Sequence, residues 1–209
     1  MTVVAIDGPA GAGKSTVARE LAAALGFAYL DTGAMYRAVG LLSLRAPDRA
    51  PGDLARAARI ELGERVRLDG EDVTEAIRAP EASEAASRVA ADPAVREALV
   101  ARQREIVGQG DWVAEGRDVG TVVAPGAAVK VFLTATDDER ARRRARQSGQ
   151  DHAAVLAEQS RRDERDSTRP TSPLLLAADA VTVDTDGLSV GEIVQHIVGL
   201  VRSATGAVD

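Results

Sequence analysis

Residues 3–16 read Val-Val-Ala-Ile-Asp-Gly-Pro-Ala-Gly-Ala-Gly-Lys-Ser-Thr. The first four form an apolar run typical of a buried strand, and residues 8–15 fit the pattern G-x-x-x-x-G-K-[ST]. Glycines let a backbone turn tightly around phosphate oxygens, which the loop N–H groups and the N-terminus of the following helix can bind. The pattern predicts a strand, a phosphate-binding loop and a helix, with a nucleoside triphosphate as the ligand.

The loop residues have separate expected roles. Lys14 is expected to reach the β- and γ-phosphates, and the Ser15 hydroxyl to bind Mg²⁺. A chance glycine-rich turn is the alternative, and the strand and helix in register with the loop argue against it. The predicted ATP-binding residues here are Gly8, Pro9, Ala10, Gly11, Ala12, Gly13, Lys14, Ser15 and Thr16.

Composition limits the class of protein. With 209 residues, the chain fits one domain with insertions, or a domain and a half. Aromatic residues make up only 2% of the chain against 45% hydrophobic residues, so the core should be aliphatic. The net charge of −6 argues against nucleic-acid binding by bulk charge. The absence of cysteine excludes disulfides and thiolate catalysis, and two distant histidines argue against a histidine-rich metal site.

The sequence carries no signal for membranes or export. The N-terminus enters a strand directly, with no basic and then apolar leader and no apolar run long enough to span a bilayer. We therefore expect a cytoplasmic protein with no membrane partner and no nucleic-acid partner. Lys14 and Lys130 are the only lysines, and all other residues in the Lys and Arg count are arginines. Because part of this excess reflects a bias in composition, an arginine indicates a phosphate site only where its position supports that role.

Strands and helices are expected to alternate along the chain. This order is typical of a parallel sheet flanked by helices. The segment 48–90 breaks the alternation with Pro47, Pro51 and Gly52, and its Asp69-Gly70 turn predicts a small hairpin. We interpret 48–90 as an inserted subdomain. The expected strands are 2–6, 27–30, 112–115, 129–133 and 180–183, and the expected helices are 14–25, 33–45, 136–147, 151–166 and 189–203.

Residues that follow the strands should meet at one edge of the sheet, where ligands of such sheets bind. Thr32 fits a helix N-cap and Arg37 follows it, while the segment 115–121 contains Arg117 and Asp118. The alternatives are a plain capping threonine, a surface ion pair between Arg117 and Asp118, and a solvated arginine-rich helix. Because these strand ends converge near a triphosphate loop, a second anion site is favoured.

Several longer motifs resemble one family. They are 6–9 with the phosphate loop, 30–37 (Leu-Asp-Thr-Gly-Ala-Met-Tyr-Arg), 71–73, 115–123 (Glu-Gly-Arg-Asp-Val-Gly-Thr-Val-Val) and 162–169 (Arg-Asp-Glu-Arg-Asp-Ser-Thr-Arg). The chain resembles the bacterial cytidylate kinases, which belong to the nucleoside monophosphate kinase group of P-loop proteins. The resemblance runs over about residues 3–203. Segments 30–37 and 115–123 are the specific ones, since many families share the phosphate loop.

The resemblance implies roles for individual residues. It assigns the acceptor phosphate to Thr32, Arg37, Arg117 and Arg169, the cytosine ring to Ser87, Arg96 and Asp118, and the ribose to Arg162 and Asp166. Lys14, Arg117 and Arg169 would act in catalysis, and Arg143 and Arg144 of the lid helix would contact ATP, with Arg140 beside them. The family often has serine at position 32, and threonine keeps the hydroxyl. For the lid helix, pairing of Glu139 with Arg143 is the simpler interpretation.

The resemblance also implies the architecture and the reaction. The expected fold is α/β, a three-layer P-loop kinase fold with a parallel five-stranded sheet. Residues 1–47 and 91–209 would form the core, with a lid at about 140–168 and a CMP-binding subdomain at 48–90. The implied function is Mg-assisted, in-line transfer of phosphate from ATP to CMP and dCMP in pyrimidine nucleotide metabolism, by a monomer.

Two other classes of function remain as alternatives. A kinase for a small hydroxylated metabolite would use Asp31 on a hydroxyl, but it would not require a base-reading subdomain. A guanine-specific switch would carry Asn-Lys-x-Asp, whereas Lys130 is followed by Val-Phe-Leu. A phosphate acceptor is largely ionised at neutral pH and needs no general base, which fits the chain's strand-end arginines. Adenylate and uridylate kinases are the competitors within the group.

Overall fold

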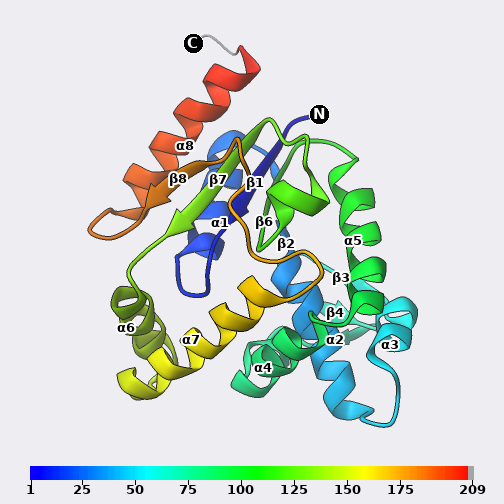
Figure 1. The fold of residues 1–209 in the computed structure, drawn as a ribbon. Helices are drawn as coiled ribbons and strands as arrows, with labels where there is room; N and C mark the ends of the chain where they lie inside the picture. Colours follow the sequence, from blue (N-terminus) through cyan, green and yellow to red (C-terminus); the bar gives the residue numbers. More distant parts are fainter. Residues whose placement is uncertain (207–209) are drawn as a thin grey trace.

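Five parallel strands form the central sheet of the computed structural model, which describes residues 1–206 (Figure 1). Their spatial order is β2-β6-β1-β7-β8. Because all pairs are parallel, the strands share one carboxyl edge, where Asp31 lies beside Glu115 and Asp7 lies beside Gly116. The strands are β1 (Val3–Asp7), β2 (Ala28–Asp31), β6 (Trp112–Gly116), β7 (Val129–Thr134) and β8 (Val181–Asp184).

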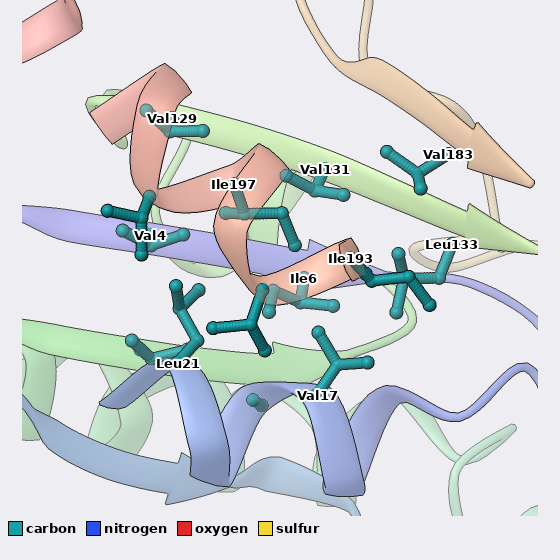
Figure 2. Close-up of a cluster of buried hydrophobic side chains, with 14 of the residues drawn as sticks. Val4, Ile6, Val17, Leu21, Val129, Val131, Leu133, Val183, Ile193 and Ile197 are labelled. Carbon is teal, nitrogen blue, oxygen red and sulfur yellow. The ribbon is translucent and has the colours of Figure 1, made fainter. Parts of the chain in front are cut away.

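Helices cover both faces of this sheet. On one face, Val4 and Ile6 of β1 pack against α1 (Lys14–Leu25) and α8 (Val190–Thr205), as Figure 2 shows. On the other face, Ala5 packs against α2 (Thr32–Arg45), α4 (Pro80–Val89) and α5 (Pro93–Val107). Successive residues of β1 therefore point into two separate cores, which is why the strand is apolar throughout. The result is three layers around an aliphatic interior, as predicted.

The phosphate loop keeps its shape through glycine. Gly8 has φ +148°, and a Cβ there would lie 2.1 Å from the carbonyl oxygen of Leu133. Gly13 is the N-cap of α1 and has φ +87°, a left-handed conformation that side chains disfavour. The turn between β1 and α1 thus follows from its glycines.

The strands and helices expected outside 48–90 are all present, with ends within two residues of the prediction. One local detail is wrong: Thr32 is not the N-cap of α2. Asp31 has the extended backbone of a cap, and its carboxylate accepts a hydrogen bond from the Ala34 N–H at 2.8 Å. Thr32 is already helical, and its hydroxyl instead donates to the Glu115 carbonyl at 2.6 Å.

The segment 48–90 contains the predicted hairpin and more. Asp69 and Gly70 both have positive φ, which suits the turn that joins β4 (Arg67–Leu68) to β5 (Glu71–Asp72). A third strand, β3 (Ile60–Glu61), was not predicted and pairs with β4. Helix α4 lies close on α2, since a Cβ at Gly40 would come within 2.6 Å of the Ala86 nitrogen. The remaining elements are α3 (Pro51–Ala57) and the 3₁₀ turn η1 (Ala76–Arg78).

Two helices project beyond the carboxyl edge of the sheet. They are α6 (Asp137–Ser148) and α7 (His152–Thr168), and they lie next to the loop that joins β1 to α1 (Figure 1). A π-helical turn, η2 (Val119–Val123), follows β6 and was not predicted. No helix in residues 1–206 has the length and apolar character needed to cross a bilayer.

Candidate active site

A cleft of about 1120 Å³ opens at the carboxyl edge of the sheet. It lies between the phosphate loop, the start of α2, the end of β6, and helices α6 and α7. This is the edge at which parallel sheets bind ligands. The predicted residues that line the cleft are Ala10, Gly11, Ala12, Gly13, Lys14, Ser15, Thr16, Arg37, Arg117, Arg143, Arg144 and Arg162.

Lys14 lies at the base of the cleft. It is buried, and its ammonium donates to the Pro9 carbonyl oxygen at 2.7 Å. Burial, together with the positive charges of Arg117 and Arg162, lowers the pKa of Lys14 to about 7. An anion in the cleft would reverse this effect, because it stabilises the charged ammonium. Lys14 is thus placed to bind a phosphate oxygen.

Glu115 is a site residue that the sequence reasoning missed. It ends β6, lines the cleft and accepts a hydrogen bond from the Tyr29 hydroxyl at 2.6 Å. Burial and the nearby Asp31 carboxylate raise its pKa, whereas Lys14 and Ser15 oppose the rise. The available signal was an acidic residue at the end of the strand beside the phosphate-loop strand, a position where P-loop proteins hold Mg²⁺.

The residues present fit a Mg²⁺ ion bound mainly through nucleotide phosphates. The exposed Ser15 hydroxyl and the Glu115 carboxylate lie at the same end of the cleft. Within residues 1–206, no group of three or more His, Cys, Asp or Glu side chains could hold a metal by itself. Mg²⁺ commonly uses one or two protein ligands together with substrate phosphates, so this donor set is sufficient.

Three arginines line the same cleft as Lys14. Arg37 pairs with Asp31 at 2.8 Å, and Arg117 pairs with Asp166 at 2.9 Å. Burial and the charges of Arg117 and Arg37 lower the pKa of Arg162 to about 10. Repulsion among partly buried cations that line one cleft is consistent with a site for an anion. The alternative interpretation, an ion pair between Arg117 and Asp118, is not what the described residues show: Arg117 pairs with Asp166, and Asp118 pairs with Arg96.

A second polar cluster lies behind the cleft and does not line it. Asp118 forms a buried ion pair with Arg96 and lies 3.9 Å from Arg169 Nη2. Burial raises the pKa of Asp118, while Arg96 and Arg169 oppose the rise. Asp166 joins the cluster through Arg117 and through Arg169 at 3.9 Å.

Several buried polar atoms of this cluster have no hydrogen-bond partner among the described residues. They include Ser87 Oγ and Arg169 Nη2, both predicted to bind the acceptor. Tyr36 and Gln103, which sequence reasoning did not select, are buried in the same cluster and interact with each other through their polar side-chain atoms. An unsatisfied buried donor or acceptor is costly, so a set of them together is consistent with a polar ligand. Thr32 is also buried and does not line the cleft.

The arginines of α6 differ in their roles. Arg143 pairs with Glu139 at 3.0 Å, as the charge spacing predicted, and also donates to Thr185 Oγ1 at 2.8 Å. Arg144 lines the cleft. Arg140 is buried and does not line the cleft. Thr185, Gly187 and Leu188, in the turn after β8, line the same end of the cleft and were not predicted.

Comparisons with known proteins agree with the sequence motifs. A family model described as cytidylate kinase matches residues 4–203. The cytidylate kinase of Solibacter usitatus is 53% identical over 215 residues, which cover 96% of this chain and 92% of that protein. The cytidylate kinase of Mycobacterium leprae is 50% identical over 219 residues, which cover 99% of this chain and 98% of that protein.

Solved structures support the fold. A gluconokinase from Sinorhizobium meliloti superposes with a TM-score of 0.55 at 18% identity, covering 98% of this chain and 94% of its own. A shikimate kinase from Acinetobacter baumannii, in complex with shikimate, gives a TM-score of 0.54 at 15% identity, with coverage of 97% and 94%. At these identities the likeness concerns the fold alone, and it confirms the three-layer α/β kinase architecture.

Proposed function

The chain belongs to the cytidylate kinase family, and from this premise we propose that it transfers a phosphoryl group from ATP to CMP, giving ADP and CDP. It is a nucleoside monophosphate kinase, and we propose that it also accepts dCMP. The observation that carries the reaction is a single cleft in which a phosphate loop faces Arg37, Arg117 and Arg162. Two phosphate groups can meet there.

The reaction needs alignment and charge neutralisation. A monophosphate has a second pKa of about 6, so its attacking oxygen is already ionised at neutral pH and no general base is required. Two anions that repel each other must be held in line while charge on the transferring group is neutralised. Lys14, Arg117 and Arg169 supply positive charge from the two sides of the transfer path.

The donor binds along the phosphate loop. Backbone N–H groups of the loop and the N-terminus of α1 hold the triphosphate, and Lys14 bonds its outer phosphates. Ser15 would hold Mg²⁺ with Glu115 nearby, and the ion supplies further neutralisation of the phosphates when bound. Arg143 and Arg144 line the cleft from α6 and would contact the donor there.

The acceptor binds at the opposite end. Arg37, Arg117 and Arg169 hold its phosphate together with Thr32, and Arg162 and Asp166 hold its ribose. Because the Thr32 hydroxyl donates to the Glu115 carbonyl in this structure, it would turn from that carbonyl to donate to the phosphate oxygens. We further propose that residues 48–90 form the subdomain that closes over CMP, and that residues 140–168 form the lid that excludes water.

Cytosine is recognised by Asp118, with Ser87 and Arg96 in support. The pairing with Arg96 opposes the effect of burial and favours the ionised, accepting form of Asp118. A carboxylate accepts a hydrogen bond from the exocyclic amino group of cytosine, whereas uracil has a carbonyl oxygen there. This contact separates the proposed function from uridylate kinase activity.

A coupled assay of ADP release tests the proposal across AMP, CMP, dCMP, UMP and GMP. We expect CMP to have the highest kcat/KM, with dCMP next. If AMP or UMP gave the highest kcat/KM, the activity would instead be that of an adenylate or uridylate kinase. ADP release that depends on a sugar or another hydroxyl acceptor, and on no monophosphate, would instead support a metabolite kinase.

Arg37→Ala and Arg117→Ala are each expected to raise KM for CMP by about ten- to a hundredfold, with a much smaller change in KM for ATP. Each variant loses a charge-assisted contact to phosphate, worth about 1.5–3 kcal/mol. Both KM values are measured from initial rates, with one nucleotide varied while the other is kept at a saturating concentration. Arg88→Ala is the matched control, because Arg88 is exposed and pairs only with Glu84 among the described residues. A rise mainly in KM for ATP would show that the two sites are reversed.

A further inference from the structure

Arg140 is a buried arginine that the proposed reaction does not use. It lies in the first turns of α6 and is only 5% exposed. Its Nη1 atom donates to the Ala10 carbonyl oxygen at 2.8 Å and to Asp163 Oδ2 at 2.6 Å, while Nη2 donates to Asp137 at 2.6 Å. The two terminal nitrogens of the guanidinium, Nη1 and Nη2, therefore both donate hydrogen bonds to the protein itself. Arg140 joins α6, α7 and the phosphate loop.

Asp163 completes the connection from α7. Its Oδ2 atom accepts from Arg140, and its Oδ1 atom lies 3.5 Å from the Ala10 nitrogen, which donates to it. The N–H and the carbonyl of Ala10 are thus both bound by this ion pair. Ala10 is in the middle of the phosphate loop, so the pair fixes the orientation of two successive peptide groups in that loop.

The loop is also held tightly between the two helices. Gly11 has φ +80°, and a Cβ there would lie 2.9 Å from Gln159 Nε2 and 3.0 Å from the Arg140 carbonyl oxygen. Gln159 is itself buried and donates to that carbonyl at 3.5 Å. Movement of α6 or α7 therefore cannot leave the loop unchanged, because closely packed groups transmit displacement.

Helix α7 carries the residues proposed for the acceptor. Arg162 precedes Asp163, and Asp166 follows it by nearly one helical turn. One helix thus holds the donor loop through Asp163 and the acceptor ribose through Arg162 and Asp166. A rigid element with contacts to two sites can couple them, provided that it responds to both.

We propose that Arg140 and Asp163 are positioning residues that form a brace, which holds the phosphate loop in its anion-binding shape and couples ATP binding to CMP binding through α7. The brace does not touch either nucleotide. This inference rests on the proposed function, because it takes Arg162 and Asp166 to bind the acceptor.

The test compares wild type with Arg140→Gln, Asp163→Asn and the double variant. The dissociation constant of CMP is measured by calorimetry with and without a non-hydrolysable ATP analogue and Mg²⁺. We expect the analogue to tighten CMP binding in the wild type, within the roughly 5- to 150-fold range usual for coupled sites. In each single variant, the ratio of the CMP dissociation constants measured without and with the analogue should be close to one. The double variant should lower it no further, because both residues belong to one unit.

Hydrogen exchange gives a readout that does not depend on catalysis. In the variants, peptides that cover residues 8–16 and 159–168 should exchange faster together, while the sheet core keeps its protection. Arg142→Gln is the matched control: Arg142 lies on the same helix but is exposed and pairs with Asp138 and Glu139. It should leave both the ratio and the exchange unchanged.

The outcomes separate the brace from the proposed function. A wild-type protein that neither binds nor phosphorylates CMP would contradict the proposed function. A wild type that phosphorylates CMP without any effect of the analogue on CMP binding would overturn the brace. Variants that keep the wild-type ratio and lose only thermal stability would also overturn it. If Arg140→Gln does not fold, Asp163→Asn carries the test, because the amide has the same shape and leaves Arg140 bonded to Ala10 and Asp137.

Discussion

Lys14→Ala is expected to lower kcat by about 10²- to 10³-fold, the loss usual when one preorganised donor to a charged transition state is removed. The Lys14 ammonium lies in the cleft, close enough to Arg117 and Arg162 for their charges to lower its pKa. Charge that develops on the transferring phosphoryl group would lose its donor from the loop side. KM for ATP should rise less than kcat falls, since the loop N–H groups remain.

The fold should survive this change. Lys14 is buried against the cleft and makes its hydrogen bond within the loop, to Pro9. In the wild type, burial and two nearby arginines destabilise the charged form of Lys14, and Glu115 and Asp7 stabilise it. The destabilising effects prevail, since the pKa is lowered, so removal of this charge is not expected to unfold the protein. Thermal melting and circular dichroism are expected to remain close to wild type. Turnover near the wild-type value would refute the role assigned to Lys14.

Lys130 offers a matched control because it is the only other lysine. It is also buried, but it pairs with Asp179 at 2.9 Å and does not line the cleft. Lys130→Met keeps the aliphatic stem and leaves Asp179, which is exposed, in contact with water. We expect this variant to lose some stability and to keep most of its kcat.

The sequence predicted the structure best where the chemistry of a few neighbouring residues allows only one backbone conformation. Gly8 and Gly13 need conformations that other residues resist, so the strand, loop and helix followed from the pattern of residues 3–16. Helix α8 was equally clear, because its apolar residues recur on one face. The structure adds a capping box between Ser189 and Glu192 at its start.

Other elements were missed for physical reasons. Helix α5 buries Arg96 and Gln103 among its apolar residues, which interrupts the amphipathic pattern that identifies a helix. The error at α2 arose because Asp31 and Thr32 are both good caps, and only the contact of Thr32 with β6 selects between them. Arg140 resembled any arginine on a charged helix, because its partner Ala10 lies 130 residues away in the chain.

The site was predicted unevenly. Candidate phosphate-binding residues could be selected from their places after the strands, whereas Ser87 and Arg96 lie within helices and were selected only through the family resemblance. Glu115 was recognised as part of the segment at the end of β6 but was not selected as a site residue. An acidic residue at the end of the strand beside the phosphate-loop strand indicates a place for Mg²⁺. The pairing of Asp118 with Arg96 and Arg169 depends on segments that meet only in the folded protein.

Asp118→Asn is expected to narrow the preference for CMP over UMP, which in the wild type should be about ten- to a hundredfold or more. An unmet buried polar group costs about 1–3 kcal/mol and more when it is charged, so uracil opposite Asp118 is disfavoured. The amide replaces part of the acceptor with a donor. The ratio should therefore fall mainly because kcat/KM for CMP decreases.

The structure adds a second consequence of this substitution. Asp118 is the buried partner of Arg96 and lies near Arg169, so the neutral amide leaves two buried guanidinium groups with less compensation. Loss of one partner of a buried pair costs about 3–5 kcal/mol. We expect a lower melting temperature, and the kinetic comparison should be made well below it. Asp179→Asn is the control, since it removes an exposed carboxylate that lies outside the cleft.

The decisive quantity is the ratio of kcat/KM for CMP to that for UMP, because a general loss of stability changes both nucleotides alike. Ser87→Ala should lower this ratio less than Asp118→Asn does, since a neutral hydroxyl contributes less than a carboxylate. A ratio unchanged in Asp118→Asn, with both activities reduced equally, would show that Asp118 acts only as the partner of Arg96. Base recognition would then have to come from residues 48–90, where Arg78, Pro80 and Ser83 line the cleft.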